Sequence, residues 1–183
     1  MAKPTVGVMG ASVNDALSNA ERNRLTELAQ TLGATLARRG CILITGATTG
    51  LPDMVAQAFR QAGGFALGIS PATNRAEHVH SYGLPEEAAD AIVFTGFGYK
   101  GRNVINIRSS DIVIIFGGAT GTLNEFTIAY DEGKIIGVLE GSGGIADHIR
   151  EVLAFCKKAT GTVFFASDPE TLAERCLSAL NSQ

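Results

Sequence analysis

Short apolar runs alternate with longer amphipathic stretches along almost the whole chain. The runs that we expect to form strands are residues 5–9, 41–45, 65–69, 91–95, 111–116, 135–139 and 163–166. Between them, apolar residues recur at three- and four-residue steps, which is typical of helices with one buried face. We expect these helices at residues 20–39, 52–61, 102–109, 122–132, 146–157 and 169–180.

The predicted strands are apolar throughout instead of alternating with polar residues, and helices come between them. This is the pattern that a parallel sheet covered on both faces requires. It predicts an α/β fold of the Rossmann type, a three-layer sandwich around a central, mostly parallel sheet of about seven strands. The 183 residues are enough for one such domain and too few for two, so we expect residues 1–183 to form a single nucleotide-binding domain.

Glycine-rich turns follow four of the predicted strands. They are Gly10–Ser12, Gly46–Gly50, Gly96–Gly101 and Gly117–Thr122. The carboxyl ends of parallel strands meet at one edge of the sheet, and α/β proteins of this kind bind their ligands there. We therefore expect the four turns to gather around one site.

Composition limits the partners that the protein can have. Charged residues make up 18% of the chain and the net charge is −3, so a basic face for nucleic acid is not expected. The apolar runs are far shorter than the ~18 residues of a membrane span, and the N-terminus does not resemble a signal peptide. The three cysteines are far apart and have no metal-ligand spacing to a histidine. We expect a cytoplasmic protein that binds neither nucleic acid nor membranes and holds no metal.

The turn Gly117-Gly118-Ala119-Thr120-Gly121-Thr122 has the composition of a phosphate site. Small residues let an anion approach the backbone amides, and the helix that follows offers free N–H groups and the positive end of its dipole. Thr122 adds a hydroxyl donor. The turn lacks the lysine of a P-loop, and its spacing differs from the dinucleotide fingerprint GxGxxG. It predicts a site for the phosphate of a nucleotide-like ligand, although such turns also serve only to join a strand to a helix.

Two charged residues are candidates for chemistry beside this turn. Glu125 is about one turn into the following helix, where a side chain points back toward the helix start. Arg102 follows the Gly96–Gly101 loop at the carboxyl end of another predicted strand. Each also has a plainer interpretation, because a carboxylate is favourable near a helix N-terminus and most arginines are solvated.

The run from Arg102-Asn103 to Gly117-Gly118-Ala119-Thr120-Gly121-Thr122-Leu123-Asn124-Glu125 resembles the paired signature of the LOG phosphoribohydrolases, once misnamed lysine decarboxylases. That signature is an Arg-Lys pair followed by PGGxGTxxE, and the 23 positions from Arg102 to Glu125 match its separation. Further turns at 8–12, 45–51 and 68–71 are similar to turns of the family, so the likeness covers most of residues 5–140. It is strongest to a shorter branch of Rossmann-type nucleotide-binding proteins.

The resemblance implies a homodimeric hydrolase that uses no cofactor. Its substrate would be a nucleoside 5′-monophosphate, such as AMP or a cytokinin riboside monophosphate, and its products the free base and ribose 5-phosphate. Arg102 and Glu125 would be the catalytic residues. The residues expected to hold the nucleotide are Gly10, Ser12, Gly46, Gly50, Asn103, Gly117, Gly118, Ala119, Thr120, Gly121 and Thr122.

The chain departs from the family signature at several positions. Gly117 replaces the proline, Ala119 replaces a glycine, Asn103 replaces the lysine, and Ala47 follows Gly46 where two glycines are usual. A methyl group at Ala119 is expected to disfavour a positive φ and to narrow the phosphate site. Some members of the shorter branch resemble molybdenum-cofactor carriers, so the alternative is a non-catalytic binding or carrier protein for a phosphorylated ligand.

A third function, dinucleotide-dependent oxidoreduction, fits the sequence less well. Dinucleotide-binding domains place an acidic residue after their second strand, where it binds the ribose. The first acidic residue after the second predicted strand is Asp53, which comes only after Pro52. We therefore rank this function below the other two.

Overall fold

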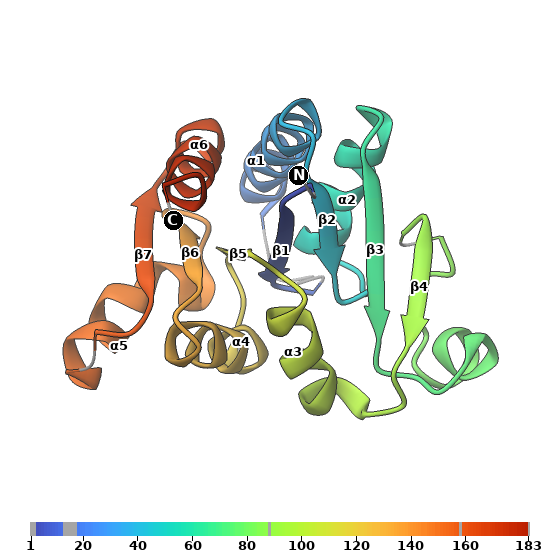
Figure 1. The fold of residues 1–183 in the computed structure, drawn as a ribbon. Coiled ribbons are helices and arrows are strands. Elements are labelled where there is room, and N and C mark those ends of the chain that lie inside the picture. The colour runs from blue at the N-terminus through green and yellow to red at the C-terminus, as the bar shows by residue number, and fades with distance from the viewer. Residues whose placement is uncertain (1–2, 13–17, 88, 158, 183) are drawn as a thin grey trace.

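A seven-stranded parallel sheet lies between two layers of helices in the computed structural model (Figure 1). The structure describes residues 3–12, 18–87, 89–157 and 159–182. Its strands are β1 (Thr5–Gly10), β2 (Ile42–Thr45), β3 (Phe65–Ser70), β4 (Ala91–Phe94), β5 (Ile112–Phe116), β6 (Ile135–Leu139) and β7 (Thr162–Ala166). Their order is β4-β3-β2-β1-β5-β6-β7, and each neighbouring pair is parallel. The predicted Rossmann-like sandwich is thus confirmed.

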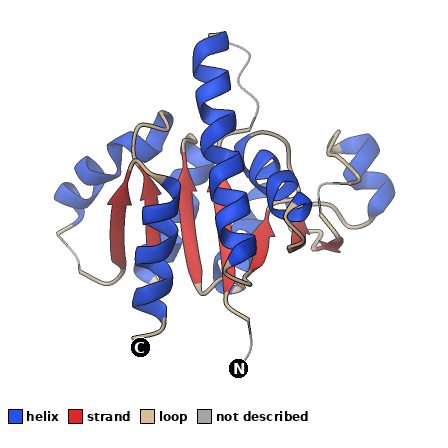
Figure 2. Cartoon of the chain, turned by 90° about the horizontal axis from the view of Figure 1, so that it is seen from above, coloured by secondary structure: helices blue, strands red, loops and turns tan. Residues whose placement is uncertain are grey.

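Helices cover both faces of this sheet. They are α1 (Asn19–Arg38), α2 (Leu51–Gln61), α3 (Gly98–Arg108), α4 (Thr120–Asp131), α5 (Ile149–Cys156) and α6 (Pro169–Leu180), with a π-helical turn η1 (Glu77–Ser81) and a 3₁₀ turn η2 (Gly144–His148). Helices α1, α2 and α6 pack on one face, and α3, α4 and α5 lie on the other (Figure 1). Seen from above, helices stand in front of and behind the strands (Figure 2).

Local capping signals set where several helices begin. Ser18 and Glu21 form a reciprocal capping box at the start of α1, since Ser18 Oγ accepts from the Glu21 amide and Glu21 Oε2 accepts from the Ser18 amide. Pro52 occupies the first turn of α2, where a missing N–H costs nothing. Asp168 caps α6 by accepting from the Thr171 amide at 2.7 Å. These starts follow directly from the sequence.

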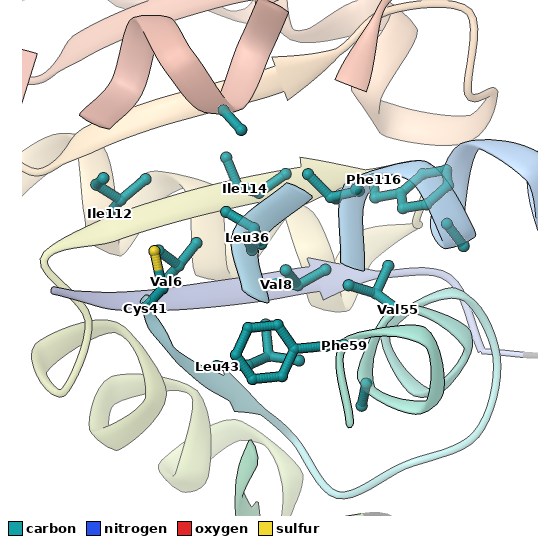
Figure 3. Close-up of a cluster of buried hydrophobic side chains, with 14 of the residues drawn as sticks. Val6, Val8, Leu36, Cys41, Leu43, Val55, Phe59, Ile112, Ile114 and Phe116 are labelled. Carbon is teal, nitrogen blue, oxygen red and sulfur yellow. The ribbon is translucent and has the colours of Figure 1, made fainter. Parts of the chain in front are cut away.

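The core is divided by the sheet into two apolar clusters. Strand side chains point alternately to the two faces, so in β5 Ile112 and Ile114 face α1 while Val113 and Ile115 face α4. Figure 3 shows the first cluster, in which Phe59 of α2 packs over the sheet. Burial of each such side chain contributes roughly 1.5–3 kcal/mol relative to exposure. The strands therefore hold their carboxyl ends, and the turns that follow, in fixed positions.

Three segments differ from the sequence prediction in detail. The helix predicted at residues 146–157 is divided into the 3₁₀ turn η2 and helix α5, which begins only at Ile149. Helix α3 begins at Gly98, four residues earlier than predicted, so Lys100 lies on the helix. The polar segment 72–89 contains the turn η1, whose His78 is buried between Ser70 Oγ at 2.8 Å and the Pro85 carbonyl at 3.1 Å. Among the described residues, no helix is long and apolar enough to cross a membrane.

Candidate functional site

The loops after β1 and β5 leave the sheet at neighbouring positions. The strands pair with Gly10 opposite Phe116, and the Ala11 amide donates to the Phe116 carbonyl at 3.3 Å. Beyond this pair the sheet continues from β1 to β2 on one side and from β5 to β6 on the other, so successive strands are added in opposite directions. Such a reversal opens a crevice at the carboxyl ends of the strands, where α/β folds bind ligands. The predicted glycine turns therefore meet at the switch point of the sheet.

The turn between β5 and α4 needs glycine at two positions. Gly117 and Gly118 have φ of 63° and 93°, and a Cβ at Gly118 would lie 2.2 Å from Thr122 Oγ1. Ala119 has φ of −133°, which an alanine adopts readily, so the expected conflict with its methyl group does not arise. The replacement of glycine by Ala119 leaves the backbone of the turn intact.

The carbonyl groups of Gly117 and Gly118 are engaged in hydrogen bonds within the protein. Gly118 and Gly117 accept hydrogen bonds from the amides of Ile145 and Ala146, at 2.8 and 3.2 Å, and the Gly117 amide donates to Ser142 Oγ at 2.9 Å. The amides of the first turn of α4 have no acceptor within their own helix, which is general for helix starts. The turn thus presents N–H groups and the positive end of the α4 dipole to a ligand.

A first pocket, which we call the α1-side pocket, opens between this turn and helices α1 and α2. It has a volume of about 480 Å³. Its apolar wall is formed by Leu25, Leu51 and Met54, with Arg22 also lining it. The predicted phosphate residues that line it are Gly10, Ser12, Gly50, Gly117, Gly118, Ala119, Gly121 and Thr122.

A second pocket, the α3-side pocket, lies across the turn and has a volume of about 510 Å³. It contains both predicted catalytic residues, Arg102 and Glu125, together with the predicted binding residues Gly46 and Asn103. Gly10, Ser12, Gly121 and Thr122 line both pockets, whereas Thr120 is exposed and lines neither. The structure therefore brings nearly all predicted site residues together, but around two cavities that share the start of α4.

Arg102 and Glu125 face each other in the α3-side pocket. Arg102 Nη1 lies 3.9 Å from Glu125 Oε1, and the two residues are only 6% and 7% exposed. The guanidinium lies against the α-carbon of Gly46, because a Cβ there would be 1.8 Å from Nη1. Within the described part of the chain, Arg102 Nε has no hydrogen-bond partner. The pair is close enough to interact but too long for the usual 2.7–2.9 Å of a charge-assisted hydrogen bond.

Burial is the largest cause of the pKa shifts of Glu125 and Arg102. It raises the pKa of the Glu125 carboxyl to about 7, because loss of water disfavours the charged form more than Arg102, Asn106 and Lys100 favour it. Burial likewise lowers the pKa of Arg102, with Glu125 and Tyr99 acting in the opposite direction. A carboxyl group with a pKa near neutrality can accept or give up a proton, which is also a property of catalytic groups.

Asn103, which replaces the lysine of the family signature, is buried beside the carboxylate. Its amide nitrogen lies 2.9 Å from Asn124 Oδ1. With the amide turned over, the nitrogen donates to Glu125 Oε1 at 3.1 Å and to the Tyr99 carbonyl at 2.9 Å. The position therefore offers a neutral amide where the family has a cation.

Several residues of the site were not singled out by the sequence. Ser142 binds the turn from the loop after β6, where the run Gly141-Ser142-Gly143-Gly144 is a fifth glycine-rich turn that the sequence displays plainly. Lys100, Tyr99 and Tyr82 line the α3-side pocket. Lys100 and Tyr99 belong to the predicted Gly96–Gly101 loop, but nothing in the sequence indicates that Tyr82 would reach the site.

The part of the chain that the structure describes contains no candidate metal site. No group of three or more His, Cys, Asp or Glu residues gathers there in a way that could hold an ion. Cys41, Cys156 and Cys176 are free thiols, and only Cys156 is exposed.

Several solved structures resemble this chain over nearly its full length. TM1055 superposes with a TM-score of 0.81 at 28% identity, covering 96% of this chain and 99% of the other. The molybdenum cofactor binding protein of Rippkaea orientalis gives 0.74 and 29%, covering 98% and 99%. The molybdenum cofactor carrier protein of Chlamydomonas reinhardtii gives 0.72 and 27%, covering 99% and 100%.

Sequence comparison agrees with this structural likeness. An uncharacterized protein of Archaeoglobus fulgidus is 31% identical over 135 residues, which are 74% of this chain and 79% of that protein. The profile of the SLOG cluster4 family matches residues 3–173. The likeness to LOG proteins is thus one of a related Rossmann-like fold, and the chain belongs to the SLOG cluster4 family.

Proposed function

We propose that this protein binds a phosphorylated small molecule at the start of α4 and serves as a binding or carrier protein for a phosphorylated pterin such as the molybdenum cofactor. The observation that carries the proposal is the turn between β5 and α4. Its carbonyl groups are engaged by Ile145 and Ala146, which leaves N–H groups and Thr122 for an anion, and a cavity lies on either side.

The comparisons support the choice of cargo. Proteins described as binding or carrying the molybdenum cofactor match 98–99% of this chain at 27–29% identity. The phosphate of the cargo would bind at Gly121 and Thr122, which line both pockets. The cargo itself supplies the redox chemistry, and the residues of this chain bind it, orient it and shield it from water.

The test compares molybdopterin with its dephosphorylated form. Thr122→Val removes the buried hydroxyl and keeps the shape of the side chain. We expect it to weaken binding of molybdopterin by about tenfold or more, because a hydrogen bond to a charged group contributes roughly 1.5–3 kcal/mol. Binding of the dephosphorylated form should hardly change.

Thr127→Val is the matched control for this experiment. Thr127 lies on the same helix, is exposed, and its hydroxyl donates to the Asn124 carbonyl at 2.9 Å. The Thr127→Val variant should bind molybdopterin as tightly as the wild-type protein does. If the wild-type protein binds both forms of the pterin equally well, the phosphate does not contribute and the proposal is wrong.

One observation favours a second function, hydrolysis of a nucleoside 5′-monophosphate. Glu125 is a buried carboxyl with a pKa near 7, and Arg102 lies 3.9 Å from it. A carboxylate in this position could stabilise positive charge on a ribose ring or orient the attacking water. Release of free base from a panel of monophosphates, lost in Glu125→Ala, would establish it. The homodimer that the LOG resemblance implies stays a prediction.

A further inference from the structure

The two pockets beside the turn differ in the groups that they offer. The α1-side pocket has Leu25, Leu51 and Met54 as its apolar wall. The α3-side pocket instead contains the side chains of Glu125, Arg102 and Asn103, each more than nine-tenths buried. Buried polar groups cost free energy unless they have partners. The ligand group that enters the α3-side pocket must therefore carry polar atoms that match these three side chains.

The unused hydrogen-bonding capacity of this pocket is specific. Arg102 Nε has no partner among the described residues, and the guanidinium lies 3.9 Å from Glu125 Oε1. Asn106, and Asn103 when its amide is turned over, donate to the Glu125 carboxylate, which has about four acceptor sites and so keeps some for a ligand. An ionised carboxylate accepts two parallel N–H donors, and a guanidinium donates to a neighbouring oxygen. The complement is a ring edge on which two adjacent N–H donors are followed by a carbonyl oxygen.

Few biological ring systems present such an edge. The 2-amino-4-oxopyrimidine portion of a pterin has an exocyclic amine, a ring N–H and a carbonyl in this order, and the corresponding edge of guanine is the same. Adenine has an amine beside an unprotonated ring nitrogen, which would place an acceptor against the carboxylate. Hypoxanthine keeps the ring N–H and the carbonyl but lacks the amine.

The remaining walls of the α3-side pocket suit a flat ring that is joined to a phosphate. Tyr82 and Tyr99 both line it, with ring centroids 5.3 Å apart and planes at 81°, so aromatic surface is available for stacking. Gly121 and Thr122 line the same cavity. Lys100 Nζ would lie 3.7 Å from a Cβ at Gly121, which places a cation beside the start of α4. Ring and phosphate can thus be held in one continuous site.

We propose that the α3-side pocket recognises the edge that pterin and guanine rings share, an exocyclic amine followed by a ring N–H and a carbonyl, with the Glu125 carboxylate accepting from the two N–H groups and Arg102 donating to the carbonyl oxygen. This inference rests on the proposed binding of a phosphorylated ligand and adds the class of its ring. Adenine, the base that the LOG resemblance implies, is disfavoured by the same groups.

The test uses GMP, IMP and AMP, which share the ribose and the phosphate and differ at the ring edge. Titration calorimetry of the full chain should give the tightest binding for GMP. We expect binding about tenfold weaker for IMP, which lacks one N–H donor to a charged acceptor, and weaker still for AMP. Glu125→Gln should remove most of the preference of GMP over IMP, because an amide oxygen replaces one carboxylate oxygen and an N–H replaces the other.

Glu132→Gln is the matched control. Glu132 follows the last turn of the same helix and pairs on the surface with Arg108 Nε at 2.8 Å. The Glu132→Gln variant should bind GMP, IMP and AMP in the same order of affinity as the wild-type protein. A GMP affinity that does not exceed that of AMP overturns the inference, including the case in which no nucleotide binds. Molybdopterin binding that depends on its phosphate would then still support the proposed function, so the two failures can be told apart.

Discussion

The guanidinium group of Arg102 occupies the space where a side chain at Gly46 would begin. A Cβ at this position would lie 1.8 Å from Nη1 and 2.5 Å from Cζ of Arg102. The resemblance to the LOG family implies that Gly46 helps to hold the nucleotide. The structure supplies another reason for a glycine at this position, because the glycine allows Arg102 to lie buried against the turn after β2 and to face Glu125.

Gly46→Ala should therefore act on the ligand site through Arg102. The methyl group displaces the guanidinium, and we expect GMP to bind roughly tenfold more weakly, since a hydrogen bond from a charged donor is lost. AMP binding should change little. Titration calorimetry with both nucleotides checks this, with urea unfolding to confirm that the variant folds. Unchanged GMP affinity would mean that Arg102 does not contact the ring.

Much of the fold could be predicted because its signals are local. The apolar run of β5 and the three- and four-residue steps between apolar residues of α1 act over a few residues, and the structure confirms the strand and the helix that they predict. The start of α3 could not be predicted in this way. Gly98 and Gly101 weaken a helix on their own, and packing of Arg102 and its neighbours outweighs this preference. The turn η1 is likewise held by the distant Ser70 and Pro85.

The candidate site was predictable to a similar degree. The spacing of Arg102 and Glu125 in the sequence indicated a shared site, and both residues line the α3-side pocket. The alternation of strands and helices indicated that the glycine turns lie at one edge of a parallel sheet. The division of the site into two pockets was not predictable, because it depends on which face of the sheet each following helix covers. Tyr82, which follows the turn η1, lines the α3-side pocket, and no local pattern in the sequence indicates this.

The preference for GMP over AMP should depend on pH. Burial raises the pKa of Glu125 to about 7 in the free protein, and the proposed contact needs its ionised form. The ratio of GMP to AMP affinity should therefore be constant well above pH 7 and fall about tenfold for each pH unit below it. Arg102, Asn106 and Lys100 also face this carboxyl and favour its charged form.

Calorimetry of both nucleotides from pH 5 to 8 measures this ratio directly. The phosphate groups of GMP and AMP titrate alike, so their contribution cancels. Glu125→Gln removes the titrating group and should give a ratio that hardly changes with pH. If the ratio of GMP to AMP affinity of the wild-type protein is constant across this range, the carboxylate does not bind the N–H groups of the ring.

Gly68 and Ala47 are expected to be energetically coupled. A Cβ at Gly68 would lie 2.9 Å from the Cβ of Ala47, which is itself in a left-handed conformation with φ of 50°. Gly68→Ala should therefore destabilise the protein by about 1–3 kcal/mol through overpacking. Adding Ala47→Gly removes the clashing methyl group and relaxes the strained backbone, so the double variant should recover much of the loss.

Urea unfolding of the two single variants and the double variant measures this coupling as a double-mutant cycle. We expect an interaction free energy of about 1 kcal/mol or more in favour of the double variant. Strictly additive effects would show that the sheet adjusts around residue 68 without pressing on the turn after β2.

Ser142 is expected to hold the phosphate turn in place. Its hydroxyl accepts from the Gly117 amide at 2.9 Å and donates to the Leu139 carbonyl, and the residue is buried. Ser142→Ala leaves two buried backbone groups without this partner, which should cost about 1–3 kcal/mol of unfolding free energy. Because the turn also positions the start of α4, molybdopterin should bind several-fold more weakly.

Ser182→Ala is a suitable comparison, since its exposed hydroxyl also donates to a backbone carbonyl, that of Ser178, at 2.9 Å. Water replaces that bond at little cost, so both stability and binding should stay near those of the wild type. The informative readout is the ratio of molybdopterin to dephosphorylated pterin affinity. A displaced turn would weaken binding of molybdopterin more than binding of the dephosphorylated pterin, because only molybdopterin has the phosphate. If Ser142→Ala lowers stability but leaves this ratio unchanged, Ser142 stabilises the fold without positioning the phosphate site.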